Sequence, residues 1–141
     1  MDDIIVGVDR SETARRAAED AAELAAAYGV NLHLVMCVDH SAPMNKTIGG
    51  DVFHVDALSE AAQHLASLAL ELSHTPVTHT VSFDEPARTL CDEAERLNAR
   101  MIVVGNRRVQ GIARVLGSVA SDVARRAPCS VLIAHTTRAD T

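Results

Sequence analysis

A glycine-bearing stretch in the second half of the chain carries the strongest chemical signal in the sequence. It leaves an apolar run at Gly105 and ends at Gly117 and Ser118, where a helical pattern begins. Glycines let backbone amides approach a phosphate closely, and the start of a helix adds the positive end of its dipole. Three arginines in the stretch add charge: Arg107, Arg108 and Arg114. The stretch indicates an anion site, with a solvated surface loop as an equally weighted alternative.

Asp9 is the second candidate for chemistry, because it directly follows the first apolar run of the chain. The turn Asp9-Arg10-Ser11 separates that run, residues 4–8, from an alanine-rich helical pattern. In open parallel sheets, ligands bind beyond the carboxyl ends of the strands, at the point where the strand order reverses. Asp9 is therefore either a ligand contact or a strand-end acid that caps its own turn, and the sequence leaves both interpretations open.

The elements that must position these residues alternate regularly along the chain. Short apolar runs predict strands at residues 4–8, 30–38, 101–104 and 129–135, and a less apolar, alternating pattern predicts an edge strand at residues 77–83. Apolar residues at helical spacing predict helices at residues 12–28, 56–73, 84–97 and 118–126. Ser11 and Gly29 are suited to begin and end the first helix. The polar, glycine-containing residues 43–51 predict a loop.

Alternation of this kind predicts an α/β fold with a parallel sheet and right-handed crossovers. We expect a single domain over residues 1–141, built on an open five-stranded parallel sheet with helices on both faces. The first and fourth strands are the most apolar and hence central, and we expect the strand order 3-2-1-4-5. The Asp9 turn and the loop over residues 105–117 are then expected to lie side by side.

The charge and composition of the chain disfavour several classes of partner. The formal net charge is −6 and only 2% of the residues are aromatic, whereas nucleic-acid binders show a basic surface and stacking aromatics. No apolar run reaches the ~18 residues of a membrane helix, and the acidic amino terminus does not suit a signal peptide. Three cysteines without CxxC spacing suit a reducing compartment. We expect a cytoplasmic protein that binds neither nucleic acid nor membrane.

Enzyme and metal chemistry find little support in the sequence. The seven histidines lack paired spacing such as HxxxH, so they are interpreted as scattered surface or strand residues. Ser118 is not part of a G-x-S-x-G elbow, and no acidic pair has a spacing that demands acid–base work. We therefore expect no catalytic residues and no metal site, and we do not expect an enzyme.

The order of these pieces resembles the universal stress protein family along nearly the whole chain. The opening run through Asp9 and Ser11 is similar to the family's first strand and acidic turn, and Cys37 lies where its second strand ends. Asp84-Glu85-Pro86 is similar to the entry to its third helix. Three further pieces of the chain resemble the family's closing signature: Val103-Val104-Gly105, Leu116-Gly117-Ser118-Val119 and Ala127-Pro128-Cys129-Ser130-Val131-Leu132-Ile133. The resemblance implies the adenine nucleotide alpha hydrolase-like fold.

The nucleotide-binding branch of that family binds ATP or a related adenine nucleotide, and the resemblance implies roles for the matching residues. Asp9 is expected to bind the ribose and adenine side, and Gly7 and Cys37 to line the adenine wall. The phosphates are expected to contact the backbone and hydroxyl groups of Gly105, Gly117, Ser118 and Val119, and Val104 is included among the nucleotide-binding residues. Arg107 and Arg108 are included as nearby cations. The implied ligand is ATP or another adenine nucleotide, cyclic AMP included, with or without Mg²⁺, and any hydrolysis is expected to be slow and incidental.

Two departures from the family's motif, G-x2-G-x9-G-[ST], leave the occupancy of this pocket open. The middle glycine is Arg108 here, and Gly117 lies 12 positions after Gly105 where the motif needs 13. The glycine that usually follows the first acidic residue is Arg10. These arginines either reach the phosphates as charged donors or block the close approach of the backbone. The chain is then either a nucleotide-binding regulator of the stress response or a dimeric interaction protein whose pocket Arg108 and Arg10 close.

The predicted fifth strand offers a surface for a partner. Its residues from Ser130 to Ala134 carry no charge, and an apolar strand at the edge of a sheet is usually covered or paired. The resemblance implies that this strand pairs across a two-fold axis. We therefore expect a homodimer through the fifth strand, between Ser130 and His135, in addition to a further protein partner that the sequence does not identify.

Overall fold

Strands and helices alternate along the chain as the sequence predicts, apart from two short strands at residues 46–48 and 51–53. The computed structural model describes residues 2–38, 46–48, 51–53, 55–72, 75–106 and 117–135. The strands are β1 (Ile4–Val8), β2 (Leu32–Cys37), β3 (Lys46–Ile48), β4 (Asp51–Phe53), β5 (Val77–Ser82), β6 (Met101–Gly105) and β7 (Ser130–Ala134). The helices are α1 (Glu12–Tyr28), α2 (Val55–Glu71), α3 (Pro86–Arg96) and α4 (Ser118–Arg126). Within these ranges, no helix has the length and apolar character that crossing a bilayer requires.

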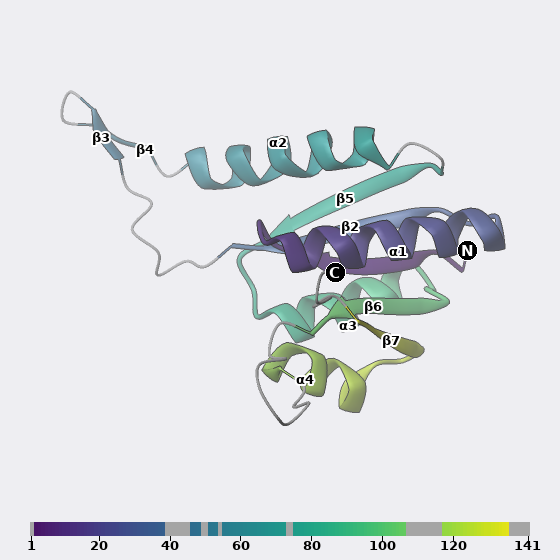
Figure 1. The fold of residues 1–141 in the computed structure, drawn as a ribbon. Coiled ribbons are helices and arrows are strands. Elements are labelled where there is room, and N and C mark those ends of the chain that lie inside the picture. The colour runs from purple at the N-terminus through teal and green to yellow at the C-terminus, as the bar shows by residue number, and fades with distance from the viewer. Residues whose placement is uncertain are drawn as a thin grey trace.

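Five of the strands form one parallel sheet in the order β5-β2-β1-β6-β7 (Figure 1). β1 lies at its centre, where Ile4 pairs with Leu32 on one side and with Met101 on the other. The predicted order 3-2-1-4-5 is confirmed, because β5, β6 and β7 are the predicted third, fourth and fifth strands. The order reverses between β1 and β6, so the carboxyl ends of these two strands mark the expected ligand-binding edge.

The expected loop over residues 43–51 is wrong in part, because β3 and β4 pair as a separate antiparallel sheet. In this sheet Lys46 pairs with Phe53, and Thr47 pairs with Val52. Most of these side chains are β-branched or aromatic, which favours strands, and two glycines separate the strands in the sequence. A pair of glycines between two short strands is a common hairpin connection. The polar and glycine content of the segment conceals this pattern.

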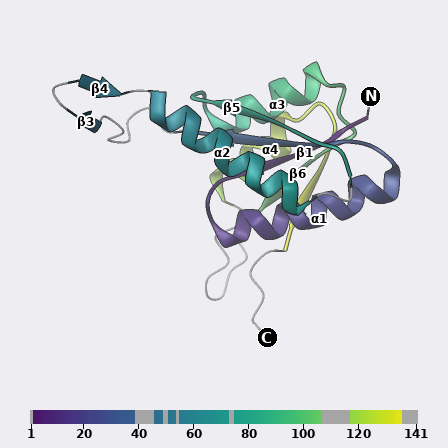
Figure 2. The same cartoon turned by 90° about the horizontal axis from the view of Figure 1, so that it is seen from above.

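Helices cover both faces of the five-stranded sheet, with α1 and α2 on one face and α3 and α4 on the other (Figure 2). Alternate residues of β1 enter the two cores, since Ile4 and Val6 pack with α1 and α2, whereas Ile5 packs with α3 and α4. The inner face of α1 consists of buried alanines: Ala14, Ala17, Ala18, Ala21, Ala22 and Ala25. The core is therefore aliphatic, and α1 packs on the sheet through small side chains.

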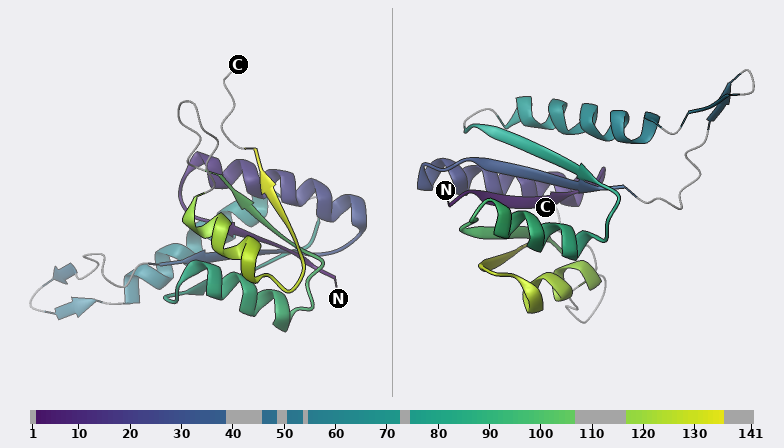
Figure 3. Two further views of the ribbon diagram at one scale, coloured as in Figure 1. Left: turned by 90° about the horizontal axis from the view of Figure 1, so that it is seen from below. Right: turned by 180° about the vertical axis from the view of Figure 1, so that it is seen from behind.

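Local signals define the starts of the helices near the ligand-binding edge. Ser11 Oγ accepts a hydrogen bond from the Ala14 amide at 3.1 Å, and Gly29 ends α1 in the left-handed region with φ of 70°. α3 begins at Pro86, and the Glu85 carboxylate accepts a hydrogen bond from an amide in its first turn. Figure 3 shows α3 and α4 next to one another on the face of the sheet opposite α1. The predicted starts of α1 and α4 and the cap of α1 are confirmed.

Candidate functional site

A cavity of about 140 Å³ opens at the carboxyl ends of β1, β2 and β6. It lies at the edge of the sheet where the strand order reverses. Its walls are mostly apolar, and Asp9 is the only carboxylate among the described residues that line it. An engineered apolar cavity of about 150 Å³ takes up a benzene molecule. This cavity therefore has room for a small planar ring.

Most of the predicted site residues meet at this cavity. Six of them line it: Gly7, Asp9, Cys37, Val104, Gly105 and Val119. Gly117 and Ser118 do not line it, although they directly precede Val119 at the start of α4. Arg107 and Arg108 lie outside the described residues. The structure thus brings the ends of the first, second and fourth predicted strands together with the start of the last helix.

Five further residues line the cavity without having been expected there: Val8, Ala14, Val35, Pro86 and Leu90. The last two come from α3, which forms a wall of the cavity on one face of the sheet. The site residues are predicted from the ends of strands and from glycine motifs, and neither feature indicates which helix residues line a cavity. The available signal is the spacing of four between Pro86 and Leu90, which places both on one side of α3.

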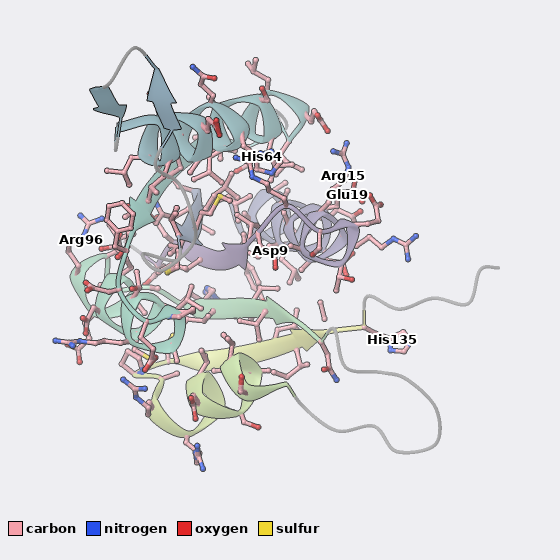
Figure 4. The ribbon with its side chains drawn as sticks, turned by 90° about the vertical axis from the view of Figure 1, so that its left-hand side faces the viewer. Asp9, Arg15, Glu19, His64, Arg96 and His135 are labelled. Atoms are coloured by element: carbon pink, nitrogen blue, oxygen red, sulfur yellow. The ribbon has the colours of Figure 1, made fainter. Side chains whose placement is uncertain are left out.

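Asp9 is held at the cavity by the turn that it caps. Its Oδ1 atom accepts a hydrogen bond from the backbone N–H of Ser11 at 2.8 Å. Ser11 in turn caps α1 through the amide of Ala14, which itself lines the cavity. Figure 4 shows Asp9 where β1 ends, between α1 and β6. Asp9 therefore caps its own turn and also faces the candidate site, so the two interpretations of this residue are compatible.

Gly7 allows α3 to pack closely against β1. A Cβ atom at this position would lie 3.1 Å from Cδ1 of Leu90, which is tighter than an ordinary van der Waals contact. Because Gly7 and Leu90 both line the cavity, a side chain at position 7 must displace Leu90 or enter the cavity. The absence of a side chain here keeps the space between β1 and α3 open.

Arg10 does not line this cavity. Its exposed side chain borders a separate polar recess together with residues of α2, among them Glu60 and His64. Figure 4 shows His64 projecting from α2 on the side of α1. The structure therefore gives Arg10 no part in closing the cavity, and Arg108, the other arginine of that hypothesis, lies outside the described residues.

A family model described as the universal stress protein family matches residues 1–135 of the chain. The chain belongs to the universal stress protein family. A universal stress protein of Mycobacterium tuberculosis is 29% identical over 95% of this chain and 96% of its own. Universal stress protein A homolog 1 of Coxiella burnetii is 31% identical, with 92% of each chain covered. The resemblance expected from the sequence motifs is confirmed.

Solved structures of universal stress proteins share this fold. One in complex with cAMP is 31% identical to this chain, with a TM-score of 0.70 and coverage of 96% of this chain and 98% of the other. The universal stress protein of Archaeoglobus fulgidus in complex with dAMP is 26% identical, with a TM-score of 0.72 and coverage of 94% and 97%. The sheet and helices described above are the adenine nucleotide alpha hydrolase-like fold of this family.

The three cysteines of this universal stress protein are free, and burial raises the pKa of each thiol. Cys37 lines the cavity, and a hydrogen bond with the Thr89 side chain offsets only part of the effect of burial on its pKa. A protonated thiol is a weak nucleophile, so Cys37 contributes an apolar wall. Across the described ranges, no group of three or more histidine, cysteine or acidic side chains is placed to hold a metal ion.

Proposed function

We propose that this universal stress protein is a stress-response binding protein that holds an adenine nucleotide at the cavity. The observation that carries the proposal is a ring-sized apolar space with the Asp9 carboxylate among its lining residues. An apolar pocket with a few oriented polar groups is the general form of a small-molecule site. The complexes of similar structures with cAMP and dAMP support an adenine nucleotide as the ligand class.

The dimensions of the site divide such a ligand into two parts. Because the cavity measures about 140 Å³, only the base enters it, between Gly7, Cys37 and Leu90, and the ribose hydroxyls lie at Asp9. The phosphates then lie outside, toward the start of α4. Gly117 provides no side-chain hydrogen bond to the first amides of α4. Amides without such a cap at the start of a helix favour an anion.

The protein binds its nucleotide without turning it over, apart from slow incidental hydrolysis. In this placement Asp9 faces the ribose and not the phosphates, and burial raises the pKa of the Cys37 thiol. Neither group is therefore poised as a general base or a nucleophile. Nucleotide occupancy acts instead by changing the contacts that the protein makes with its partners. The three free cysteines support a reducing, cytoplasmic location.

Calorimetric titration with ATP and with cyclic AMP tests this proposal, with CTP as a control that retains the phosphates and changes the base. We expect saturable heat with at least one of the adenine nucleotides and a much weaker signal with CTP. Mass spectrometry of the denatured protein is expected to detect adenine nucleotide retained during purification. No heat with either adenine nucleotide at millimolar ligand rejects the proposal and favours an interaction protein of the same fold.

We also propose that two copies of the chain pair through β7. This strand is at one edge of the five-stranded sheet and carries no charged residue. Val131 and Ile133 pack into the core that α3 and α4 cover. Leu132 therefore faces the other way, and it is 36% exposed. An exposed apolar side chain on an uncharged edge strand suits pairing with a second copy.

Replacing Leu132 with arginine is expected to convert the dimer into a monomer, because the change places two like charges at the two-fold contact. Light scattering at tens of micromolar protein measures the mass of each form. Leu70→Arg is the matched control, since Leu70 is 79% exposed on α2, and α2 packs on β5 at the edge of the sheet opposite β7. A monomeric mass for the unmodified protein contradicts this part of the proposal.

A further inference from the structure

A buried histidine joins the sheet to α3 on the face opposite α1. His33 lies on β2 and is buried. Its Nδ1 atom lies 2.6 Å from the Thr78 hydroxyl of β5, and its Nε2 atom lies 2.9 Å from the Thr80 hydroxyl. The same Nε2 atom lies 3.1 Å from Oε1 of Glu93 on α3. Three elements therefore meet through one imidazole ring.

The charges around this ring are already balanced when the ring is neutral. Arg96 binds both oxygens of Glu93, at 2.7 and 2.9 Å, and this contact holds the pKa of Glu93 at about 2. Burial lowers the pKa of His33, and the nearby Glu93 and Asp3 oppose that effect only in part. β5 contributes the two neutral threonine hydroxyls to the cluster. A proton on His33 adds a second cation beside a carboxylate that Arg96 already pairs.

For a neutral ring, the hydrogen bonds favour one tautomer. Nε2–H donates to Glu93, which is ionised and can only accept, and Nδ1 accepts from the hydroxyl of Thr78. Protonation of Nδ1 turns this acceptor into a donor, so the Thr78 hydroxyl must rotate its proton away. With α3 docked, the charged ring is shielded from water, whereas it would be hydrated if α3 moved away. Protonation therefore favours a state in which α3 is less closely docked.

The same helix forms a wall of the cavity. Leu90 lies about one turn before Glu93 on α3, lines the cavity and packs against Gly7. Pro86, one turn earlier, also lines the cavity. The position of α3 on the sheet therefore sets the width of the space in which a base would lie. Figure 4 shows Arg96, at the other end of α3, well away from Asp9.

We propose that His33 positions α3 through Glu93, and that protonation of His33 in mild acid loosens α3 and the Leu90 wall of the cavity. His33 is thus a positioning residue for the site, although it lies outside the cavity. The docking of α3 is a property of the free protein, so the central test requires no ligand. The consequence for ligand affinity rests on the proposed nucleotide-binding function.

Hydrogen exchange of the α3 amides between pH 7.5 and pH 5.5, corrected for the intrinsic rates, tests the proposal. In the closed state α3 is docked on the sheet, and in the open state it is released. Below the ordinary His pKa of about 6.5, the closed state binds fewer protons than the open state. The equilibrium constant for opening therefore increases by up to about tenfold for each pH unit by which the pH falls in that range. We expect this increase in the wild type and its absence in His33→Gln. His79→Gln is the matched control, because His79 is exposed on β5, and it is expected to behave as the wild type.

Equal pH dependence in wild type and His33→Gln overturns the proposal, as does a wild-type profile that is flat. If His33→Gln does not fold, an NMR pH titration of the wild-type protein tests the proposal instead. The α3 amide shifts must then follow the titration of the His33 ring, and amides that stay unchanged while His33 protonates contradict the proposal.

Affinity for cyclic AMP at the same pH values provides the second measurement. We expect it to fall in acid in the wild type and in His79→Gln, and to stay constant in His33→Gln. If cyclic AMP and ATP do not bind at any pH, the proposed function fails, whereas the exchange experiment still tests the role of His33. If ligand affinity is independent of pH while α3 opens as expected, the coupling to the cavity is wrong.

Discussion

Replacing Asp9 with asparagine is expected to weaken adenine-nucleotide binding by more than tenfold while leaving the fold intact. The Oδ1 atom of Asp9 accepts the Ser11 N–H at 2.8 Å, and asparagine retains this oxygen. The substitution removes the charge and one acceptor for the ribose hydroxyls. A hydrogen bond to a charged group contributes about 1.5–3 kcal/mol, and tenfold in affinity corresponds to about 1.4 kcal/mol. Calorimetric titration of both proteins measures the change.

Asp9→Ala separates the structural role of this residue from its role toward the ligand. Alanine lacks the acceptor as well as the charge, so the turn before α1 loses its cap. We expect Asp9→Ala to lower the free energy of unfolding by about 1 kcal/mol, in the range of a lost cap, whereas Asp9→Asn stays near the wild type in urea denaturation. Wild-type affinity in Asp9→Asn shows that Asp9 only caps its turn.

Valine in place of Gly7 is expected to abolish nucleotide binding, with a loss of at least a hundredfold, in a protein that still folds. A Cβ atom alone lies 3.1 Å from Cδ1 of Leu90, and the two methyl groups of valine extend into the space that the base requires. The end of the Leu90 side chain can move into the cavity of about 140 Å³. The destabilisation therefore stays within the about 1–3 kcal/mol that is typical of overpacking.

Ala22→Val is the control for this experiment. Ala22 is fully buried on α1, in the core on the other face of the sheet, and does not line the cavity. Its enlargement is expected to destabilise the protein to a similar degree and to leave nucleotide affinity unchanged. Calorimetry and urea denaturation of the two variants distinguish a blocked cavity from a loosened fold. A folded Gly7→Val protein with wild-type affinity contradicts the placement of the base.

The central strands could be predicted from the sequence because strands buried on both faces leave no position for a polar side chain. Residues 4–8 and 101–104 show this pattern, and they form β1 and β6 side by side. Asp9 could be assigned to the ligand-binding edge for the same reason, since it is the first charged residue after β1. The confirmed strand order then brings Gly105 to the same edge.

The contribution of α3 could not be predicted in the same way. An apolar stripe shows that a helix packs on the sheet, but it does not show which side chain meets Gly7, because that depends on how the helix crosses the strands. His33 presents a related difficulty. Its partners on β5 and α3 lie 45, 47 and 60 positions away in the sequence, so no local pattern links them. The spacing of residues in the sequence also does not show whether the Arg10 side chain points toward the cavity or away from it.

The buried alanines of α1 help to order the candidate site before a ligand binds. Alanine has no side-chain rotamers to lose on burial and is the best helix former. The helix thus packs on the sheet through six buried alanines at a low cost in conformational entropy. The turn that carries Asp9 is directly joined to this helix through Ser11. The carboxylate is therefore preorganised, and a ligand that arrives at the cavity need not order it.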